Sequence, residues 1–264
     1  MSKVKKLSIV AILLLLVGVI GSIFTFNLTE ATNVMEESKE FVDKDFTDID
    51  VVADNAEIEI LPSDNTITTV TFGGNDSSYH FSADVKDDIL SIKVKEKRLT
   101  FINFSFSSPP KLKVYVPVKN YETLQIKGNN GKITVQGMQS EDIDVQTNNG
   151  RIELKDIQST RLSTDTDNGA ILLEHVEGEI IGRTNNGRVK VTVEHLDRPI
   201  DIQTDNGRIE IETKTEPTNA ILDMKVDNGS VTVFGNSNWD TVIGEGENLI
   251  KLKTNNGKIE LTKH

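Results

Sequence analysis

The sequence predicts an all-β protein and, more narrowly, a β-solenoid of parallel strands. Val, Ile and Thr recur with a period of two, a phrase containing Asn-Gly returns about every 20 residues, and aromatic residues make up only 5% of the 264 residues. Two-residue alternation is typical of strands, and a fixed period of this length indicates stacked units that cannot bury their faces alone. So few large rings suit a thin aliphatic core.

Residues 1–26 are predicted to be a membrane anchor. Three lysines precede an apolar run over residues 7–24, which at about 1.5 Å per residue is just long enough to cross about 30 Å of hydrocarbon. A cleavable signal peptide is the alternative, but its apolar core is usually shorter and the best exit site, residues 29–31, is poor. The lysines place residues from about 27 onward outside the cytoplasm. We therefore expect a single-pass cell-membrane protein.

The part beyond this anchor is strongly acidic. The whole chain has a formal charge of −12, and Lys3, Lys5 and Lys6 are the only charged residues before residue 27, so the remainder carries −15. Such a domain does not attract nucleic acid or an anionic membrane surface. The chain has no cysteine, which excludes disulfides, thiol nucleophiles and cysteine-ligated zinc.

Residues 27–45 are polar without a clear period and are predicted to be a tether. Residues 46–120 are predicted to be an N-terminal β region and cap, because the first coil of an array otherwise leaves its apolar end and strand edges open. The region begins with "FTDIDVVADNAEIEILPSD", which is a degenerate copy of the later repeat. Further strand-like runs follow, with turns at Gly73-Gly74, Asp87-Asp88 and Pro109-Pro110.

Residues 121–264 hold the repeats and are predicted to form the solenoid. The Asn of successive Asn-Gly pairs are 19, 19, 18, 20, 22 and 28 residues apart, at positions 130, 149, 168, 186, 206, 228 and 256. Apolar residues or Thr recur at fixed offsets around each pair, for example Ile143, Val145, Thr147, Ile152 and Leu154. Alternate side chains of a strand face one way, so each unit turns an aliphatic row inward on either side of the pair.

Each Asn-Gly pair is predicted to be a corner of the chain. Both residues tolerate positive φ, so the pair can bend the backbone sharply, and it fits a two-residue hairpin equally well. The alternatives are an antiparallel meander and a closed coil of parallel strands. Another apolar residue follows the second strand in place of an all-polar turn, and this favours the closed coil. These residues are Met138, Ile157, Val176 and Leu196.

The order of the segments resembles a known bacterial family. "EIEILPSD" is followed by "DDILSIKVK", by "PPKLKVYVPVKNYETLQIKGNNGKITVQGM" and then by repeated T(N/D)NG units. From about Phe46 to the C-terminus this order resembles the bacterial putative-adhesin family of β-strand repeat proteins, with its membrane-anchored LiaG-like branch. The resemblance implies a β-solenoid outside the membrane and, for that branch, association with the envelope stress response. It implies no activity. The segment "VFGNSNWDTVIGEGENLIKLK" departs from the pattern.

Catalytic motifs are missing from the sequence. It contains no HExxH, glycine-rich phosphate loop, GxSxG or regular calcium nonapeptide, so no cofactor is expected. His175 and His195 follow strands in adjacent units but lack a third ligand. The alternative to a non-enzymatic protein is a carbohydrate-active β-helix enzyme, which would need one cluster of acid, base and Arg in a groove.

One outward stripe is the candidate binding surface. Cations stand two residues after most of the seven Asn, at Lys132, Arg151, Arg188, Arg208 and Lys258. An amide or carboxylate stands just before each Asn, so stacked coils would place a cationic ladder beside a polar one. The structural interpretation is that the side-chain amide ladder satisfies the corner backbone, while the cations offset neighbouring aspartates. The functional one is a long edge for an extended anionic or polysaccharide ligand.

Taken together, these patterns predict a non-enzymatic, extracytoplasmic component of the cell envelope. The expected partners are the membrane, through the N-terminal helix, and either cell-wall polymer or the membrane proteins of an envelope stress system. Nucleic acid is not expected.

Overall fold

The computed structural model describes residues 35–74, 79–97 and 109–263. All regular structure in these residues is β, which confirms the all-β prediction. No helix with the length and hydropathy of a membrane span occurs in this described part. The predicted anchor, residues 1–26, and residues 27–34 of the predicted tether lie outside it.

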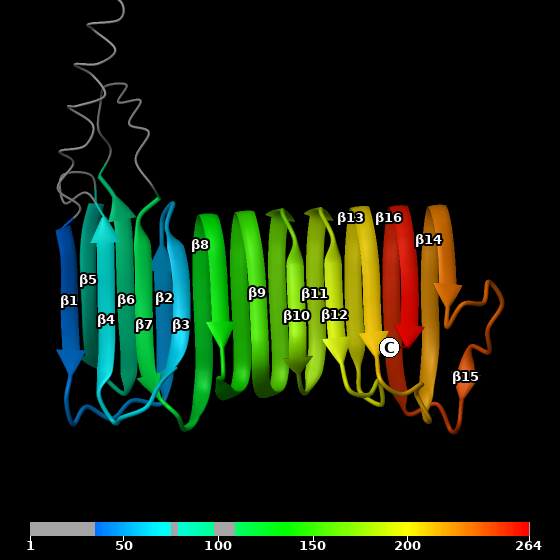
Figure 1. Cartoon of the computed structure of the whole chain (residues 1–264), viewed down its shortest axis with the longest axis horizontal. Coiled ribbons are helices and arrows are strands. Elements are labelled where there is room, and N and C mark those ends of the chain that lie inside the picture. Colours follow the sequence, from blue (N-terminus) through cyan, green and yellow to red (C-terminus); the bar gives the residue numbers. More distant parts are fainter. Residues whose placement is uncertain (1–34, 75–78, 98–108, 264) are drawn as a thin grey trace, which may run out of the picture.

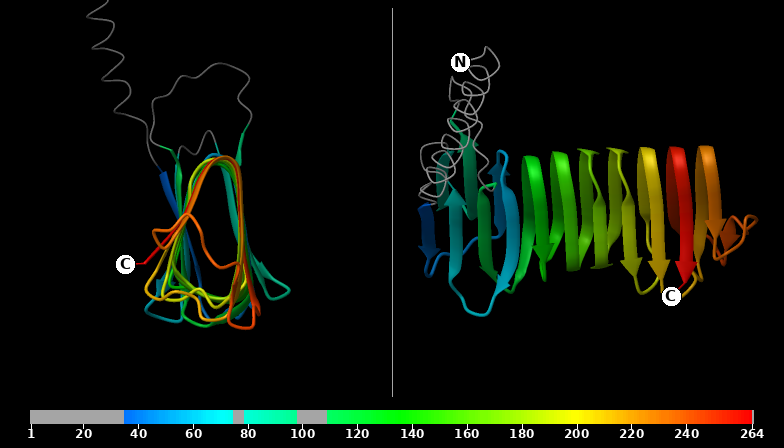
Figure 2. Two further views of the ribbon diagram at one scale, coloured as in Figure 1. Left: turned by 90° about the vertical axis from the view of Figure 1, so that its right-hand side faces the viewer. Right: turned by 45° about the horizontal axis from the view of Figure 1, so that its top comes forward.

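The strands join into one sheet that winds along a rod (Figure 1). They are β1 (Met35–Phe41), β2 (Asp48–Ala53), β3 (Glu57–Ser63), β4 (Thr68–Gly74), β5 (Tyr79–Lys86), β6 (Ile89–Glu96), β7 (Lys111–Pro117), β8 (Asn120–Gln136), β9 (Gln139–Asn168), β10 (Ile171–Val176), β11 (Glu179–Asn186), β12 (Val189–Val193), β13 (Ile200–Thr213), β14 (Ala220–Val233), β15 (Val242–Ile243) and β16 (Asn248–Lys263). Seen along the rod, the coils superpose on a narrow closed outline (Figure 2).

Neighbouring coils pair in parallel and in register. In β8 and β9, Asn130 pairs with Asn149 and Gly131 with Gly150, while Asn206 of β13 pairs with Asn256 of β16. Parallel pairing of equivalent residues is the arrangement of a closed coil, and an antiparallel meander would not produce it. Each residue type of the repeat therefore forms a row along the rod.

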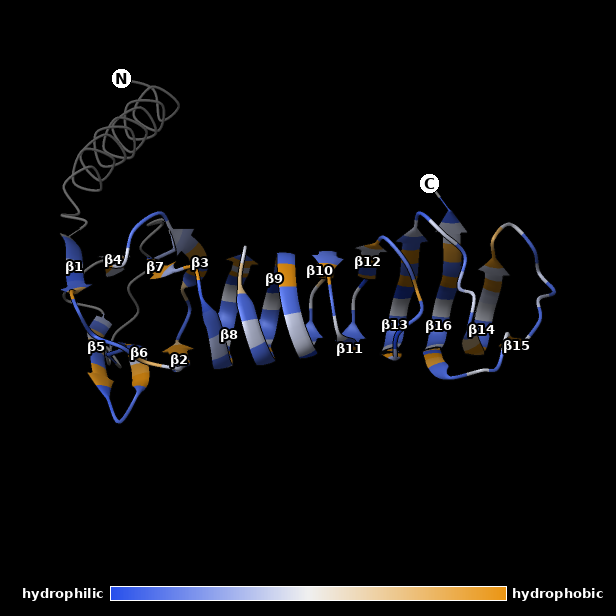
Figure 3. Ribbon diagram, turned by 90° about the horizontal axis from the view of Figure 1, so that it is seen from below, coloured by the Kyte–Doolittle hydropathy of each residue, from blue (hydrophilic) through white to orange (hydrophobic). Residues whose placement is uncertain are grey.

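The core is a thin stack of aliphatic side chains. The inward positions of the repeat are buried, with Ile143, Val145 and Ile152 at 0% exposure, and the strands alternate in hydropathy along their length (Figure 3). The additional apolar residue after the second strand is buried as well, as the closed-coil interpretation expected. Those residues are Met138, Ile157, Val176 and Leu196.

The N-terminal β region supplies one coil and a cap. β2 and β3 pair in parallel with β8, so the degenerate copy of the repeat forms a coil of the solenoid. Beyond it β6 and β7 continue the coils, and β5 and β4 then pair antiparallel with them. Rings of the cap pack together, with Phe72 and Phe81 stacked at 5.5 Å between centroids.

Part of the predicted tether is a strand. β1, within the segment 27–45, pairs antiparallel with β4 from Met35 opposite Gly74 to Phe41 opposite Thr68. Its sequence lacks an apolar alternation because it lies at the edge of the sheet, where hydrogen bonds to one neighbour stabilise a strand whose side chains are mostly exposed.

The last coils do not follow chain order. β16, the C-terminal strand, pairs in parallel with β13 on one side and with β14 on the other. The chain therefore leaves a gap after β13, builds β14 at the end of the rod, and returns through residues 234–247 to fill the gap. The 28-residue interval between the last two Asn-Gly pairs contains this return.

Candidate functional site

The corners carry a continuous ladder of asparagine amides. Each Asn of an Asn-Gly pair donates its Nδ2–H to the Oδ1 of the Asn in the neighbouring coil, and the row begins at Asn55 of the first coil. In spatial order the further members are Asn130, Asn149, Asn168, Asn186, Asn206, Asn256 and Asn228. Asn168 to Asn149 measures 2.8 Å and Asn256 to Asn206 2.9 Å. Asn55 in turn donates to Glu96 Oε2 at 2.5 Å.

The row just before these asparagines is bonded more sparsely. Asn129 donates to Asp54 at 2.8 Å, and Asn185 and Asn255 each donate to an aspartate of the adjacent coil at 3.0 Å. The amide and carboxylate side chains of the corner thus bond one another, whereas the structural interpretation expected them to satisfy the corner backbone.

Glycine is required at the corners because neighbouring backbones approach closely. A Cβ on Gly187 would lie 1.6 Å from the carbonyl oxygen of Gly169, and a Cβ on Gly207 would lie 1.6 Å from that of Gly187. The expected positive φ is wrong for four of the seven corners: it occurs at Gly131, with φ 125°, and at Gly229 and Gly257, with φ 152° and 158°, but not at Gly150, Gly169, Gly187 or Gly207. At Gly150, Gly187 and Gly207 the close approach of the neighbouring backbone, and not a positive φ, therefore requires glycine.

The structure brings the predicted cationic stripe together. In the strand register Lys132 lies beside Arg151, and Arg208 lies beside Lys258. Arg188 lies beside Arg208, because the residues that follow them, Val189 and Ile209, are register partners. Between Arg151 and Arg188 the row is interrupted by Ala170, and at the end of the rod it finishes at Ser230.

Three glutamates, each two positions after a cation, contact all five cations of this stripe, in place of the neighbouring aspartates that the structural interpretation expected. Lys132 and Arg151 both contact Glu153, at 2.5 and 3.3 Å, and Arg188 and Arg208 both contact Glu210, at 3.7 and 2.9 Å. Lys258 contacts Glu260 at 2.8 Å. Partial burial alone would raise the pKa of Glu153, but hydrogen bonds and charges from the two cations outweigh it and lower that pKa. The hydrogen bond to Glu210 raises the pKa of Arg208.

The pairing predicts unequal effects of removing the cations. We expect Arg151→Gln to leave the melting temperature nearly unchanged, because Glu153 keeps Lys132. Arg188→Gln with Arg208→Gln leaves Glu210, whose side chain is only 17% exposed, without either cation and should lower the melting temperature by about 2–6 °C. Thermal unfolding measures both. Adding Glu210→Gln should recover most of the loss, and a double variant that melts like the parent would contradict this assignment.

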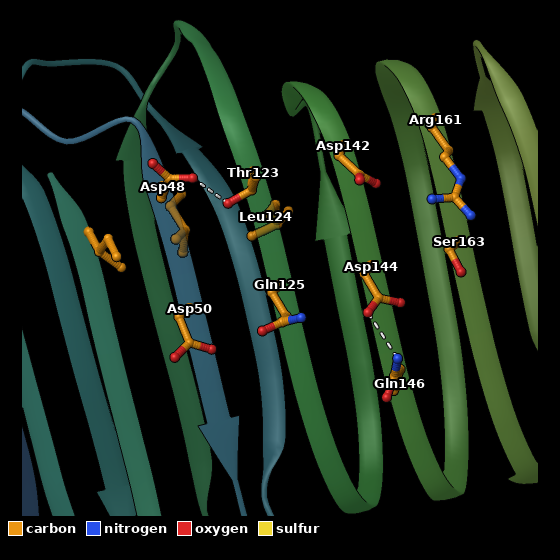
Figure 4. A pocket seen from close by; sticks show the side chains of 12 residues that line it. Asp48, Asp50, Thr123, Leu124, Gln125, Asp142, Asp144, Gln146, Arg161 and Ser163 are labelled. Atoms are coloured by element: carbon orange, nitrogen blue, oxygen red, sulfur yellow. Dashed lines mark hydrogen bonds between the residues drawn. The ribbon is translucent and has the colours of Figure 1, made fainter.

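A shallow polar groove crosses the outer face of the strands that precede the corners (Figure 4). β2 contributes Asp48 and Asp50, and β9 contributes Asp142 and Asp144. Asp48 accepts a hydrogen bond from Thr123 at 2.5 Å, and Asp144 accepts one from Gln146 at 2.9 Å.

Neighbouring charges make the groove an acidic surface. Arg161 lines it, but its Nε lies 3.9 Å from Glu179 of the next coil. Burial raises the pKa of the adjacent Asp165, with Asp167 and Asp144 adding to the rise and Arg183 opposing it. No cluster of three metal-ligating side chains occurs in the described ranges. Sequence reasoning missed this groove, although its polar residues other than Gln146 are the outward positions seven and five before Asn55, Asn130, Asn149 and Asn168.

The two histidines have separate partners. His175 Nδ1 lies 3.1 Å from Asp156 Oδ1, and His195 Nδ1 lies 2.8 Å from Arg198 Nη2. The guanidinium of Arg198 disfavours a metal cation at the ring of His195, and the side chain of His175 is 48% exposed.

Two overlapping segments, residues 46–175 and 120–262, match the Toastrack DUF4097 family model. The chain belongs to the Toastrack DUF4097 family. This confirms the resemblance to the putative-adhesin proteins that the order of its segments indicated. No curated protein sequence matches the chain.

Solved structures resemble this Toastrack chain at low sequence identity. A putative adhesin from Bacteroides fragilis is 14% identical, with 87% of this chain and 98% of that chain covered and a TM-score of 0.50. A putative cell adhesion protein from Clostridium sporogenes is 12% identical, with 88% and 100% covered and a TM-score of 0.44. A putative lipid binding protein from Parabacteroides distasonis is 18% identical, with 88% and 98% covered and a TM-score of 0.35. The first of these supports the fold alone.

Proposed function

We propose that this Toastrack protein is a non-enzymatic surface component of the cell envelope. Residues 1–26 anchor it in the membrane, the Asn-Gly repeats form its extracytoplasmic solenoid, and the outer groove binds uncharged stretches of wall polysaccharide. Through this attachment it contributes to the response to envelope stress. The name of the putative adhesin from Bacteroides fragilis, which shares the fold, is consistent with a surface role.

One observation carries this proposal: parallel coils in register present polar side chains at equal intervals of about 4.8 Å. A polymer that also repeats can contact such a surface at several successive coils. In the groove Gln125, Asp144 and Gln146 offer amide and carboxylate groups, which accept hydrogen bonds from sugar hydroxyls. The charge of −15 disfavours anionic polymer, and the corner cations are already paired with glutamates.

Retention on purified wall sacculi tests the groove. We expect the full-length chain in mild detergent to bind, and the combined variant Gln125→Ala, Asp144→Ala and Gln146→Ala to bind about tenfold more weakly, since about 1.4 kcal/mol of contacts is lost. Gln203→Ala with Lys253→Ala removes two side chains of the same outer face far from the groove and should bind like the parent. The stripe variant Arg151→Gln should also bind normally. Equal retention of the groove variant and the parent would refute this binding site.

The proposed orientation predicts the outcome of proteolysis on intact protoplasts. Added protease should remove the domain and leave a short membrane-bound stub, because the lysines precede the apolar run. Immunoblotting of the membrane fraction with tags at either end measures this. Complete protection of the domain would reverse the orientation.

A carbohydrate-active enzyme is the second candidate, because the groove combines Asp142 and Asp144 with Arg161. Release of soluble saccharide from sacculi by the parent, abolished in Asp142→Asn or Asp144→Asn, would favour it. We expect no such release, since Arg161 pairs with Glu179.

A further inference from the structure

The end of the rod farthest from β1 presents a strand edge that is mostly unpaired (Figure 1). The segment that returns from β14 lies beside this edge, and its Phe234, Trp239 and Ile243 pack, partly buried, against the core. β14 pairs with β16 along its whole length, but on its other edge β15 pairs only with Ala220 and Ile221. Near the end of β14, Val233 exchanges hydrogen bonds with Asn236. Within the part of the chain that the structure describes, residues 223–232 have no strand partner on this edge.

The inward side chains of this edge are only half-buried. Met224, Val226 and Val231 face the core direction but remain partly exposed. Their register partners on β16 are 0% exposed; these are Leu252, Thr254 and Ile259. A further strand layer would bury the three side chains and pair the free backbone groups.

Charge decides which partner fits. The outward residues of the edge alternate as Asp223, Lys225 and Asp227. When a two-fold axis relates two copies, β14 runs antiparallel to itself. With the axis at Val226, Lys225 of each copy lies opposite Asp227 of the other, and the paired residues 223–229 do not include Ala220 and Ile221, which β15 already pairs. Opposite charges directly across an antiparallel pair stabilise it.

We propose that two copies of this chain join end to end through β14, antiparallel and around a two-fold axis. A head-to-tail contact is disfavoured, because β1 at the other end carries Glu36, Glu37 and Glu40 with one lysine and would oppose the two aspartates of β14. The two-fold contact is closed, so it yields a dimer and no filament. The two β1 strands then lie at opposite ends of a rod of double length.

Charge exchange tests the proposal by sedimentation of the full-length chain in mild detergent. We expect a dimer for the parent. Lys225→Asp places carboxylates opposite carboxylates across the two-fold contact, and the double variant Asp223→Lys with Asp227→Lys places lysines opposite lysines. Each of these two variants should weaken association at least about tenfold. An equimolar mixture of the two variants should restore the dimer. Lys253→Asp changes the same row one strand inside the edge and should dimerise like the parent.

A second measurement avoids dependence on charge variants that fold poorly. The chain has no cysteine, so Val226→Cys introduces a single thiol at the proposed axis. Oxidation in membranes should link two such chains, while Lys253→Cys should not cross-link. A monomeric parent would show that the charges only protect the edge and would overturn the proposal, as would a dimer that Lys225→Asp leaves intact.

Discussion

Replacing Gly187 with alanine lowers the free energy of unfolding by about 3 kcal/mol or more, because the stack has no room for a methyl group. The added Cβ would lie 1.6 Å from the carbonyl oxygen of Gly169 and 2.7 Å from its carbonyl carbon. Both are backbone atoms and cannot rotate away. The N–H of Gly187 also donates to Asn206 O at 3.0 Å, so moving this corner disturbs the next coil as well. Chemical denaturation measures the loss, and hydrogen exchange of the corner amides locates it.

Gly235→Ala is the matched control for backbone conformation. Gly235 has φ +82°, and no atom lies within 4 Å of its added Cβ, so alanine costs only the strain of a left-handed backbone, about 1–2 kcal/mol. If positive φ were the reason for glycine in this chain, Gly235 would be the more sensitive position. A loss at Gly187 no greater than that at Gly235 would refute the close-approach explanation.

Truncating Leu252 to alanine destabilises the C-terminal coils by about 2–5 kcal/mol. Leu252 is 0% exposed, because β16 lies between β13 and β14, and its removal leaves a cavity in a packed interior. Coils of a solenoid contact only their neighbours, so the effect should appear as faster hydrogen exchange in β13, β14 and β16.

Met224→Ala tests the order of these coils, since Met224 is the register partner of Leu252 on β14. Met224 is half-buried at the end of the rod, so its truncation should cost about 1 kcal/mol. If the coils followed chain order, residues 248–263 would form the terminal coil and the two effects would be reversed. Denaturation of both variants under the same conditions distinguishes the two orders.

Alternation within single repeats was readable from the sequence. Ile143, Val145, Ile152 and Leu154 were predicted to face inward and are buried, because side-chain direction in a strand depends only on local parity. Met138 and its equivalents similarly indicated a closed coil. The cationic stripe followed from the same periodicity, since equivalent residues of parallel coils in register must lie in one row.

Features without a local sequence pattern were not predicted. β1 lay within the predicted tether because an edge strand is stabilised by hydrogen bonds to β4 and needs no apolar face. The groove was not predicted because Asp48 and Asp144 are about 100 residues apart in the chain. Only the pairing of β2 with β8 brings these two residues to one surface.

The sequence by itself determined the all-β class, the corners, the inward rows and the family, because each depends on residue types at short, repeated spacings. Only the tertiary structure decided why the corners need glycine, which cations are neutralised, and where the C-terminal strand lies. Gly187 is constrained by the carbonyl of Gly169 in the next coil, and β16 is placed by pairing with both β13 and β14. These contacts join residues that are distant in the chain, so they depend on how the coils stack, and a repeat of about 20 residues specifies each coil without specifying the order in which coils meet.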